Sequence, residues 1–275
     1  MNKVVISGVL QLLGFHLCDQ CLNQGIEVVG FDTLERNKLL KEEMLHRFGR
    51  NANFQFVETN VESEQLKTYL EEATMVFYVN EECDDISQIE QIVEVCDQMH
   101  LPVVVSSSLE VYGTCETICK EDSKLHPITK FGKRKKLEEH YWLKDAVRNR
   151  RRIAIFRMPT LYGPFQDPND SFHQVVYQFV KNHVNLDPIA NSSSLAQQYL
   201  FVNNAVDAFL LMMNRQFSCE IYNLSANENK FCMEKIRTEL NYEHKYTFRE
   251  GLEIMKNHLL KILETNPSLY EHFCQ

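Results

Sequence analysis

The chain has 275 residues, of which 44% are hydrophobic and 24% charged, and it carries a formal net charge of -9. This length predicts one large folded unit, and the composition is that of a soluble globular protein rather than a disordered or fibrous one. The negative charge argues against nucleic acid or an anionic membrane as the main partner. Basic runs at residues 130–136 and 148–152 are more typical of a solvated surface than of a binding patch.

The apolar run after Lys3 resembles the beginning of a signal peptide, but no small-residue cleavage site follows it and Asp19 interrupts it. No apolar segment reaches the roughly 20 residues that a membrane span needs. We therefore expect a cytoplasmic protein that makes no contact with a membrane.

The chain contains nine cysteines, whose spacings do not match a disulfide framework. Cys18 and Cys21 form a C-x-x-C, but they fall inside an expected helix, and no second pair or histidine cluster completes a metal site. We expect free thiols and no bound metal.

Short apolar runs alternate with amphipathic segments of helical length in the first part of the chain, which predicts βαβ units. The expected strands are residues 4–7, 27–31, 54–57, 75–79, 103–107 and 153–157. The expected helices are residues 14–24, 38–48, 61–72, 86–99 and 133–145. This alternation predicts an α/β fold, a doubly wound parallel sheet of the Rossmann-like type with helices on both faces.

The alternation weakens after Pro164, where turn-rich segments appear. Further strands are expected at residues 198–202 and 220–224, and further helices at residues 205–213, 233–239 and 252–264. We therefore assign residues 1–164 to a Rossmann-like core. Residues 165–275 are assigned mostly to a smaller C-terminal lobe, with some elements returning to the core.

A glycine-containing turn between Gly8 and Gly14 joins the first expected strand to the first helix. A helix N-terminus at this place binds a pyrophosphate, because its free N–H groups attract negative charge. Asp32 ends the second expected strand, where a carboxylate accepts the hydroxyls of an adenosine ribose and repels a 2′-phosphate. The sequence therefore predicts NAD rather than NADP.

Residues 6–17 (ISGVLQLLGFHL) resemble the TGxxGxxG turn of the extended short-chain dehydrogenase/reductase family. This family includes NAD-dependent nucleotide-sugar epimerases and dehydratases, so the resemblance implies NAD as cofactor and a nucleotide sugar or related small molecule as ligand. In the family, the middle glycine of this turn lets the backbone approach the pyrophosphate closely. Gln11 replaces this glycine, and because its side chain would crowd that space we expect weak or lost cofactor binding. Asn60 matches a family aspartate that faces the adenine.

Residues 103–113 (VVVSSSLEVYG) resemble the family segment SSS-x-x-VYG. The match implies that Ser108 hydrogen-bonds the substrate hydroxyl or ketone; the alternative is that these serines cap the following loop. Residues 127–138 (PITKFGKRKKLE) resemble the family helix start P-x-x-x-YG-x-SK, which puts Lys135 on the family's lysine and Phe131 on its tyrosine. Phenylalanine cannot transfer the proton, a step worth roughly 10²–10⁴-fold in rate. Tyr112 and Glu110 remain as possible replacements.

The resemblance extends further along the chain. Residues 156–164 (FRMPTLYGP) resemble LR-x-x-NVYGP, which implies that Tyr162 lies on the sugar side of the cleft. Gln197 replaces the arginine that clamps the nucleotide diphosphate, and residues 78–82 depart from the family's H-x-AA turn. The family's habit of dimerising through the helix that carries the lysine implies a homodimer.

Two interpretations follow from these matches and departures. The first is a catalytically impaired or silent member of the family. The second is an active NAD-linked oxidoreductase, epimerase or dehydratase that acts on a nucleotide sugar with a different acid or base.

Overall fold

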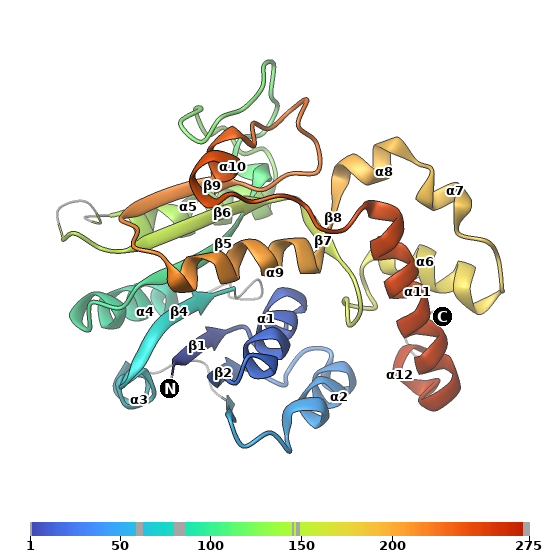
Figure 1. The fold of residues 1–275 in the computed structure, drawn as a ribbon, viewed down its shortest axis with the longest axis horizontal. Helices are drawn as coiled ribbons and strands as arrows, with labels where there is room; N and C mark the ends of the chain where they lie inside the picture. The colour runs from blue at the N-terminus through green and yellow to red at the C-terminus, as the bar shows by residue number, and fades with distance from the viewer. Residues whose placement is uncertain (1, 59–62, 80–85, 145, 147–148, 272–275) are drawn as a thin grey trace.

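The computed structural model describes residues 2–58, 63–79, 86–144, 146 and 149–271. Its centre is a seven-stranded sheet in which all pairings are parallel, in the order β3-β2-β1-β4-β5-β6-β9 (Figure 1). The strands are β1 (Lys3–Ser7), β2 (Glu27–Asp32), β3 (Phe54–Glu58), β4 (Ala73–Tyr78), β5 (Val103–Ser108), β6 (Ile153–Met158) and β9 (Cys219–Asn223). The order reverses between β1 and β4, and in such sheets ligands bind at the carboxyl ends of the strands near this point.

Helices cover both faces of this sheet, because successive side chains of a strand point to opposite faces. Val4 and Ile6 belong to one apolar core, with α1 (Leu12–Asn23), α2 (Lys38–Phe48) and α9 (Val202–Leu211). Val5 belongs to the other core, with α3 (Ser63–Leu70), α4 (Ile86–Gln98) and α5 (Lys130–Leu143). Each strand is therefore apolar on both sides, as the continuous apolar runs predict.

The C-terminal lobe is built around a small parallel sheet of β7 (Thr160–Tyr162) and β8 (Tyr199–Phe201), beside the carboxyl ends of the main strands (Figure 1). Its helices are α6 (Ser171–Lys181), α7 (Asp187–Ala190), α8 (Ser193–Gln198), α11 (Phe248–Thr265) and α12 (Ser268–Glu271). Helix α10 (Glu234–Leu240) packs near β9, and short 3-10 turns are η1 (Leu109–Val111) and η2 (Met212–Asn214). Strand β9 belongs to the central sheet, and α9 packs in the core beside α1.

The doubly wound fold predicted from the sequence is confirmed, although some elements differ. Helix α6 was missed, yet its signals are local: Asp170 accepts hydrogen bonds from the N–H groups of Phe172 and His173 at the helix start. Helix α5 begins three residues earlier than expected, because Thr129 caps it by accepting a hydrogen bond from the Gly132 N–H. The division of the chain at residue 164 stays a prediction.

The cysteines depart from the expectation of free thiols at one pair. A disulfide joins Cys115 and Cys119, whose Cα atoms are 6.3 Å apart. Cys18 and Cys21 are free thiols on the buried side of α1, and burial raises the pKa of Cys21 to about 12. Within the described ranges, no cluster of three His, Cys, Asp or Glu side chains could hold a metal ion.

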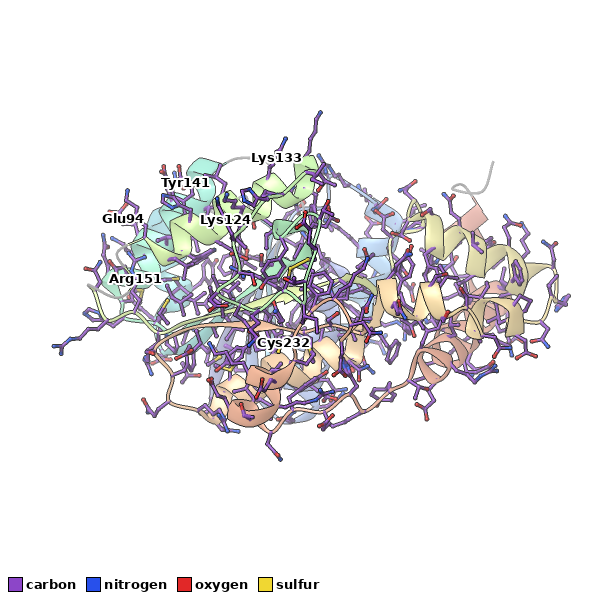
Figure 2. All side chains as sticks on the ribbon, turned by 90° about the horizontal axis from the view of Figure 1, so that it is seen from above. Glu94, Lys124, Lys133, Tyr141, Arg151 and Cys232 are labelled. Carbon is purple, nitrogen blue, oxygen red and sulfur yellow. A yellow bond between two sulfur atoms is a disulfide. The ribbon has the colours of Figure 1, made fainter. Side chains whose placement is uncertain are left out.

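Helices α4 and α5 contact each other at the end of the molecule away from the C-terminal lobe. Figure 2 shows Glu94 of α4 and Tyr141 of α5 at this surface. The expected homodimer, which would use this surface, stays a prediction. In the part of the chain that the structure describes, no helix combines the length and apolarity needed to cross a membrane.

Candidate functional site

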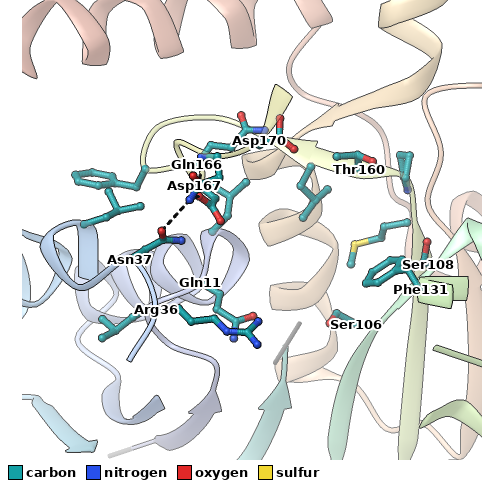
Figure 3. Close-up of a pocket in the computed structure, with 18 of the residues that line it drawn as sticks. Gln11, Arg36, Asn37, Ser106, Ser108, Phe131, Thr160, Gln166, Asp167 and Asp170 are labelled. Atoms are coloured by element: carbon teal, nitrogen blue, oxygen red, sulfur yellow. Dashed lines mark hydrogen bonds between the residues drawn. The ribbon is translucent and has the colours of Figure 1, made fainter. Parts of the chain in front are cut away.

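A cavity of about 680 Å³ opens at the carboxyl ends of the central strands, where the core meets the C-terminal lobe (Figure 3). Its wall combines the starts of α1 and α2, the end of β5, the first turns of α5 and the segment between β7 and α6. The lining residues used below are Gln11, Arg36, Asn37, Lys41, Ser106, Ser108, Glu110, Phe131, Arg134, Lys135, Gln166, Asp167 and Asp170. The cavity thus lies where a doubly wound sheet binds its ligands.

The turn between β1 and α1 requires glycine at two positions, Gly8 and Gly14. Gly8 has a φ of 87°, and its N–H donates a 2.8 Å hydrogen bond to the Phe31 carbonyl. A Cβ atom at Gly14 would lie 2.0 Å from the Gly8 carbonyl oxygen, so only glycine fits there. Gln11 precedes α1 without a side-chain capping bond to its first turn. This helix start therefore fits an anion such as a pyrophosphate, with the Gln11 side chain at its edge.

Asp32 ends β2 as expected, but its carboxylate faces the protein rather than the cavity. Its Oδ2 accepts a 2.8 Å hydrogen bond from the Leu10 N–H, and its Oδ1 accepts one from the Thr33 N–H. Lys41 on α2 donates to the same Oδ1 at 2.9 Å, and both side chains are 3% exposed. Burial raises the pKa of Asp32, and Lys41 opposes that rise. Lys41 and Arg36 line the cavity, whereas Asp32 is not among its lining residues.

The structure brings together Ser108, Phe131 and Lys135, the three positions to which the family resemblance assigns proton transfer. Ser108 ends β5, and Figure 3 shows it next to Phe131 at one end of the cavity. The Ser108 hydroxyl accepts a 3.1 Å hydrogen bond from the Glu110 N–H and thus caps the following turn, while its role at a substrate stays a prediction. Because α5 starts at its Thr129 cap, Phe131 lies in the first turn and Lys135 one turn later. The Lys135 Nζ is 5.8 Å from the centre of the Phe131 ring.

Lys135 has a carboxylate partner that the sequence interpretation missed. Its Nζ lies 2.9 Å from Glu138 Oε2, and both side chains are 2% exposed. The same Nζ donates a 3.4 Å hydrogen bond to the Ser106 carbonyl. The i,i+3 spacing of Lys135 and Glu138 on a helix is the signal that could have revealed this pair. The ammonium charge is therefore balanced inside the protein, which weakens its influence on a neighbouring ligand group.

Tyr112 is engaged in a buried network that gives it a structural role. Arg157 binds both oxygens of Glu139 at 2.8 and 2.9 Å, and its Nη1 donates a 2.8 Å hydrogen bond to the Tyr112 hydroxyl. The Tyr112 hydroxyl donates to Asn223 Oδ1 at 2.6 Å, and burial raises its pKa. Tyr112 is therefore unsuited to replace the missing tyrosine as a base.

Glu110 differs from Tyr112 because it lies at the cavity and is exposed. It accepts a short hydrogen bond from the hydroxyl of Thr129, the residue that caps α5. A carboxylate held in this way is a candidate acid or base next to the position of Phe131.

Buried polar atoms that have no protein partner point into the ligand space. The Ser106 hydroxyl and both amide atoms of Gln166 have no hydrogen-bond partner among the described residues, and the two residues are 2% and 3% exposed. Both residues line the cavity, and Figure 3 shows Gln166 on the segment between β7 and α6. Because buried polar groups are nearly always hydrogen-bonded, a bound polar molecule or water is expected to satisfy them. The residues present therefore fit a polar ligand as large as a dinucleotide.

Two residues that the resemblance places at the substrate lie elsewhere. Tyr162 is fully buried in the C-terminal lobe, where its hydroxyl donates a 2.8 Å hydrogen bond to the Phe248 carbonyl. Gln197 is exposed on α8 and accepts a 3.3 Å hydrogen bond from the Asn227 amide. Neither is among the residues that line the cavity. Asn60 and residues 80–82 lie outside the described residues, and Tyr78 is buried at the end of β4.

Comparison with known sequences identifies relatives across most of the chain. Residues 4–225 match the model of the family described as NAD dependent epimerase/dehydratase. The chain is 21% identical over 238 residues to the uncharacterized UDP-glucose epimerase YtcB of Bacillus subtilis (strain 168), covering 78% of this chain and 73% of that protein. It is 23% identical to dTDP-4-dehydro-6-deoxyglucose reductase of Escherichia coli, covering 94% and 88% of the two chains.

Comparison with solved structures shows the same fold. UDP-glucuronic acid 4-epimerase from Bacillus cereus, in complex with UDP-glucuronic acid and NAD, superimposes with a TM-score of 0.78 at 20% identity, covering 94% of this chain and 99% of that one. A tyrosine-to-phenylalanine variant of that enzyme, in complex with NAD and a 4-deoxy-4-fluoro analogue of UDP-glucuronic acid, superimposes with a TM-score of 0.79 at the same identity and coverage.

Proposed function

The chain belongs to the NAD-dependent epimerase/dehydratase family, and we propose that its cavity binds a nicotinamide dinucleotide next to a nucleotide sugar. The uncapped start of α1 supports the pyrophosphate position. The unpartnered groups of Ser106 and Gln166 support a large polar ligand. The Bacillus cereus enzyme binds NAD and UDP-glucuronic acid, and this cavity is proposed to take ligands of the same two classes, a nicotinamide dinucleotide and a nucleotide sugar.

Each part of the cavity has a role in this proposal. The turn at Gly8 and Gly14 would hold the pyrophosphate, and Lys135 would face the nicotinamide end of the dinucleotide. Ser108 would hydrogen-bond the oxygen on the sugar carbon that is oxidised or reduced, accepting from it as a hydroxyl or donating to it as a ketone. The dinucleotide supplies a hydride acceptor or donor when it is bound.

We infer that proton transfer by the family mechanism is impaired, and one observation carries this inference. Phe131 occupies the position beside Ser108 and Lys135 where a phenol would act, and its ring has no oxygen. The pairing of Lys135 with Glu138 adds to the effect, since a balanced ammonium lowers a neighbouring pKa less. The phenylalanine variant of the Bacillus cereus enzyme was solved in complex with NAD and a 4-deoxy-4-fluoro analogue of UDP-glucuronic acid. Binding without efficient turnover is therefore the expected behaviour.

Glu110 supports a second candidate, an active enzyme with a different base. Its carboxylate is exposed at the cavity and is held by the Thr129 hydroxyl. This alternative predicts slow turnover that Glu110→Gln abolishes while nucleotide-sugar binding is unchanged. The silent protein shows the same absence of turnover with and without this substitution.

Calorimetry with UDP-glucose, UDP-glucuronic acid and dTDP-glucose, each with and without dinucleotide, tests binding. Chromatography of the same mixtures after long incubation tests turnover. We expect at least one nucleotide sugar to bind and none to be converted. Absence of binding by all of them, with or without dinucleotide, would contradict the proposed site. Conversion that survives in Glu110→Gln would contradict both candidates.

A further inference from the structure

The cavity wall at the end of β2 carries positive rather than negative charge. Arg36 and Lys41 line the cavity there, together with Asn37 at the start of α2. Asp32, the acidic residue that ends the strand, is not a lining residue, and its side chain is 3% exposed. A dinucleotide with its pyrophosphate at the start of α1 places its adenosine ribose near the end of the second strand.

Hydrogen bonds inside the protein use most of the capacity of the Asp32 carboxylate. Three donors reach it, namely the N–H groups of Leu10 and Thr33 and the ammonium of Lys41. A carboxylate offers roughly four lone-pair positions, so little remains for the two hydroxyls of a ribose. The Lys41 charge also balances the Asp32 charge within the buried pair, which removes the repulsion that a carboxylate exerts on a 2′-phosphate.

From this arrangement we propose that the cavity prefers the phosphorylated dinucleotide NADP(H), with Arg36 as the residue that receives the 2′-phosphate. This inference rests on the proposed dinucleotide function and reverses the preference that Asp32 predicts from the sequence. A guanidinium binds a phosphate through two parallel hydrogen bonds, and an arginine near this ribose is the usual means of accepting a 2′-phosphate. The Lys41 charge is already balanced by Asp32, so Arg36 supplies the net positive charge on this wall.

Two acidic side chains of the cavity, Asp167 and Asp170, come from the segment between β7 and α6. Asp170 caps α6, and Asp167 accepts hydrogen bonds from the backbone and side-chain N–H groups of Asn169. Figure 3 shows Asp170 on the opposite side of the pocket from Arg36, which lies next to Gln11. The Asp170 carboxylate is therefore distant from Arg36, whereas Asp167 approaches the start of α2, because the Asn169 amide donates to both Asp167 and Asn37.

The proposal must be separated from a role of Arg36 at the pyrophosphate, which NAD and NADP share. We therefore compare 2′,5′-ADP with 5′-ADP, and NADPH with NADH, by calorimetry on the full chain. The variant Arg36→Ala removes an exposed side chain, so folding is preserved. Lys38→Ala is the matched control, because Lys38 is 67% exposed at the start of the same helix and does not line the cavity.

We expect 2′,5′-ADP and NADPH to bind the native protein at least about tenfold more tightly than 5′-ADP and NADH, which corresponds to about 1.4 kcal/mol. Arg36→Ala should remove this difference by weakening only the 2′-phosphorylated ligands. Lys38→Ala should retain it.

Three results would overturn the proposal. Tighter binding of NADH than NADPH would sink the preference while leaving the proposed dinucleotide function intact. An equal loss of NADH and NADPH affinity in Arg36→Ala would assign Arg36 to the pyrophosphate instead. Failure of every dinucleotide and both ADP probes to bind the native protein would contradict the inference and the proposed function together.

Discussion

Acidification is expected to destabilise the C-terminal lobe and its contact with the core, because two histidines are buried there and burial lowers their pKa values. His173 on α6 is 2% exposed, and neither of its ring nitrogens has a hydrogen-bond partner among the described residues. Its ring lies 4.9 Å from that of Tyr270. His258 on α11 packs against Phe165, on the segment between β7 and α6, with ring centres 4.4 Å apart. The guanidinium of Arg47, on α2, covers the same phenylalanine.

The magnitude follows from the pKa of His173, which burial lowers from 6.5 to about 4. A lowered pKa in the folded state means that the unfolded chain binds more protons at acidic pH. The associated stability is therefore fully present above pH 6.5 and is lost as the pH falls from there through about 4. The loss is about 2 kcal/mol at pH 5 and about 3 kcal/mol when complete. His258, whose pKa is lowered to about 3 by burial and by nearby positive charges, shifts in the same direction.

Urea unfolding at a series of pH values between 7.5 and 4.5 measures this effect, with about 1 to 3 kcal/mol/M expected for the urea slope. His173→Phe keeps an aromatic ring beside Tyr177 and removes the titrating group, so the fall in unfolding free energy toward pH 5 should be about 2 kcal/mol smaller than in the native protein. His183→Asn is the control, because His183 is exposed and has a φ of 56° that asparagine also adopts. The reasoning is refuted if both variants lose stability with pH as steeply as the native protein.

Three further predictions concern the site and its support. Phe131→Tyr alone should give no turnover of UDP-, GDP- or dTDP-sugars that chromatography can measure, because Glu138 still pairs with Lys135. Strong activity in this variant would show that the cofactor and substrate sites are intact. Gln11→Gly should raise dinucleotide affinity in calorimetry by about tenfold, or about 1.4 kcal/mol, because it removes a side chain from the edge of the pyrophosphate turn. Unchanged affinity would show that the Gln11 side chain does not crowd the ligand. Arg157→Met should lower the free energy of unfolding by about 3–5 kcal/mol by leaving the Glu139 carboxylate buried and unpaired. The double variant with Glu139→Leu should recover much of that loss, and equal instability of the two variants would argue against the ion pair as the cause.

The sequence by itself determined the fold and the local geometry of its motifs. Apolar runs and helical periodicity depend on near neighbours in the chain, so they identify strands and helices reliably. The same holds for Phe131 and Lys135, which are one helical turn apart and therefore face the cavity together. The need for glycine is likewise built into the turn between β1 and α1, because Gly8 has a φ of 87° and a Cβ atom at Gly14 would clash with the Gly8 carbonyl.

Only the tertiary structure decided which groups remain available to a ligand. Asp32 has the position expected of a ribose acceptor, but its carboxylate accepts a hydrogen bond from Lys41 on α2 instead. Tyr162 has the expected motif, yet its hydroxyl is used by the Phe248 carbonyl, 86 residues away in the chain. Gln166 and Arg36 join one cavity from separate segments that no short motif connects. Motifs specify residue types at fixed spacing, whereas hydrogen-bond partners and exposure depend on packing between segments distant in the chain, which spacing does not encode.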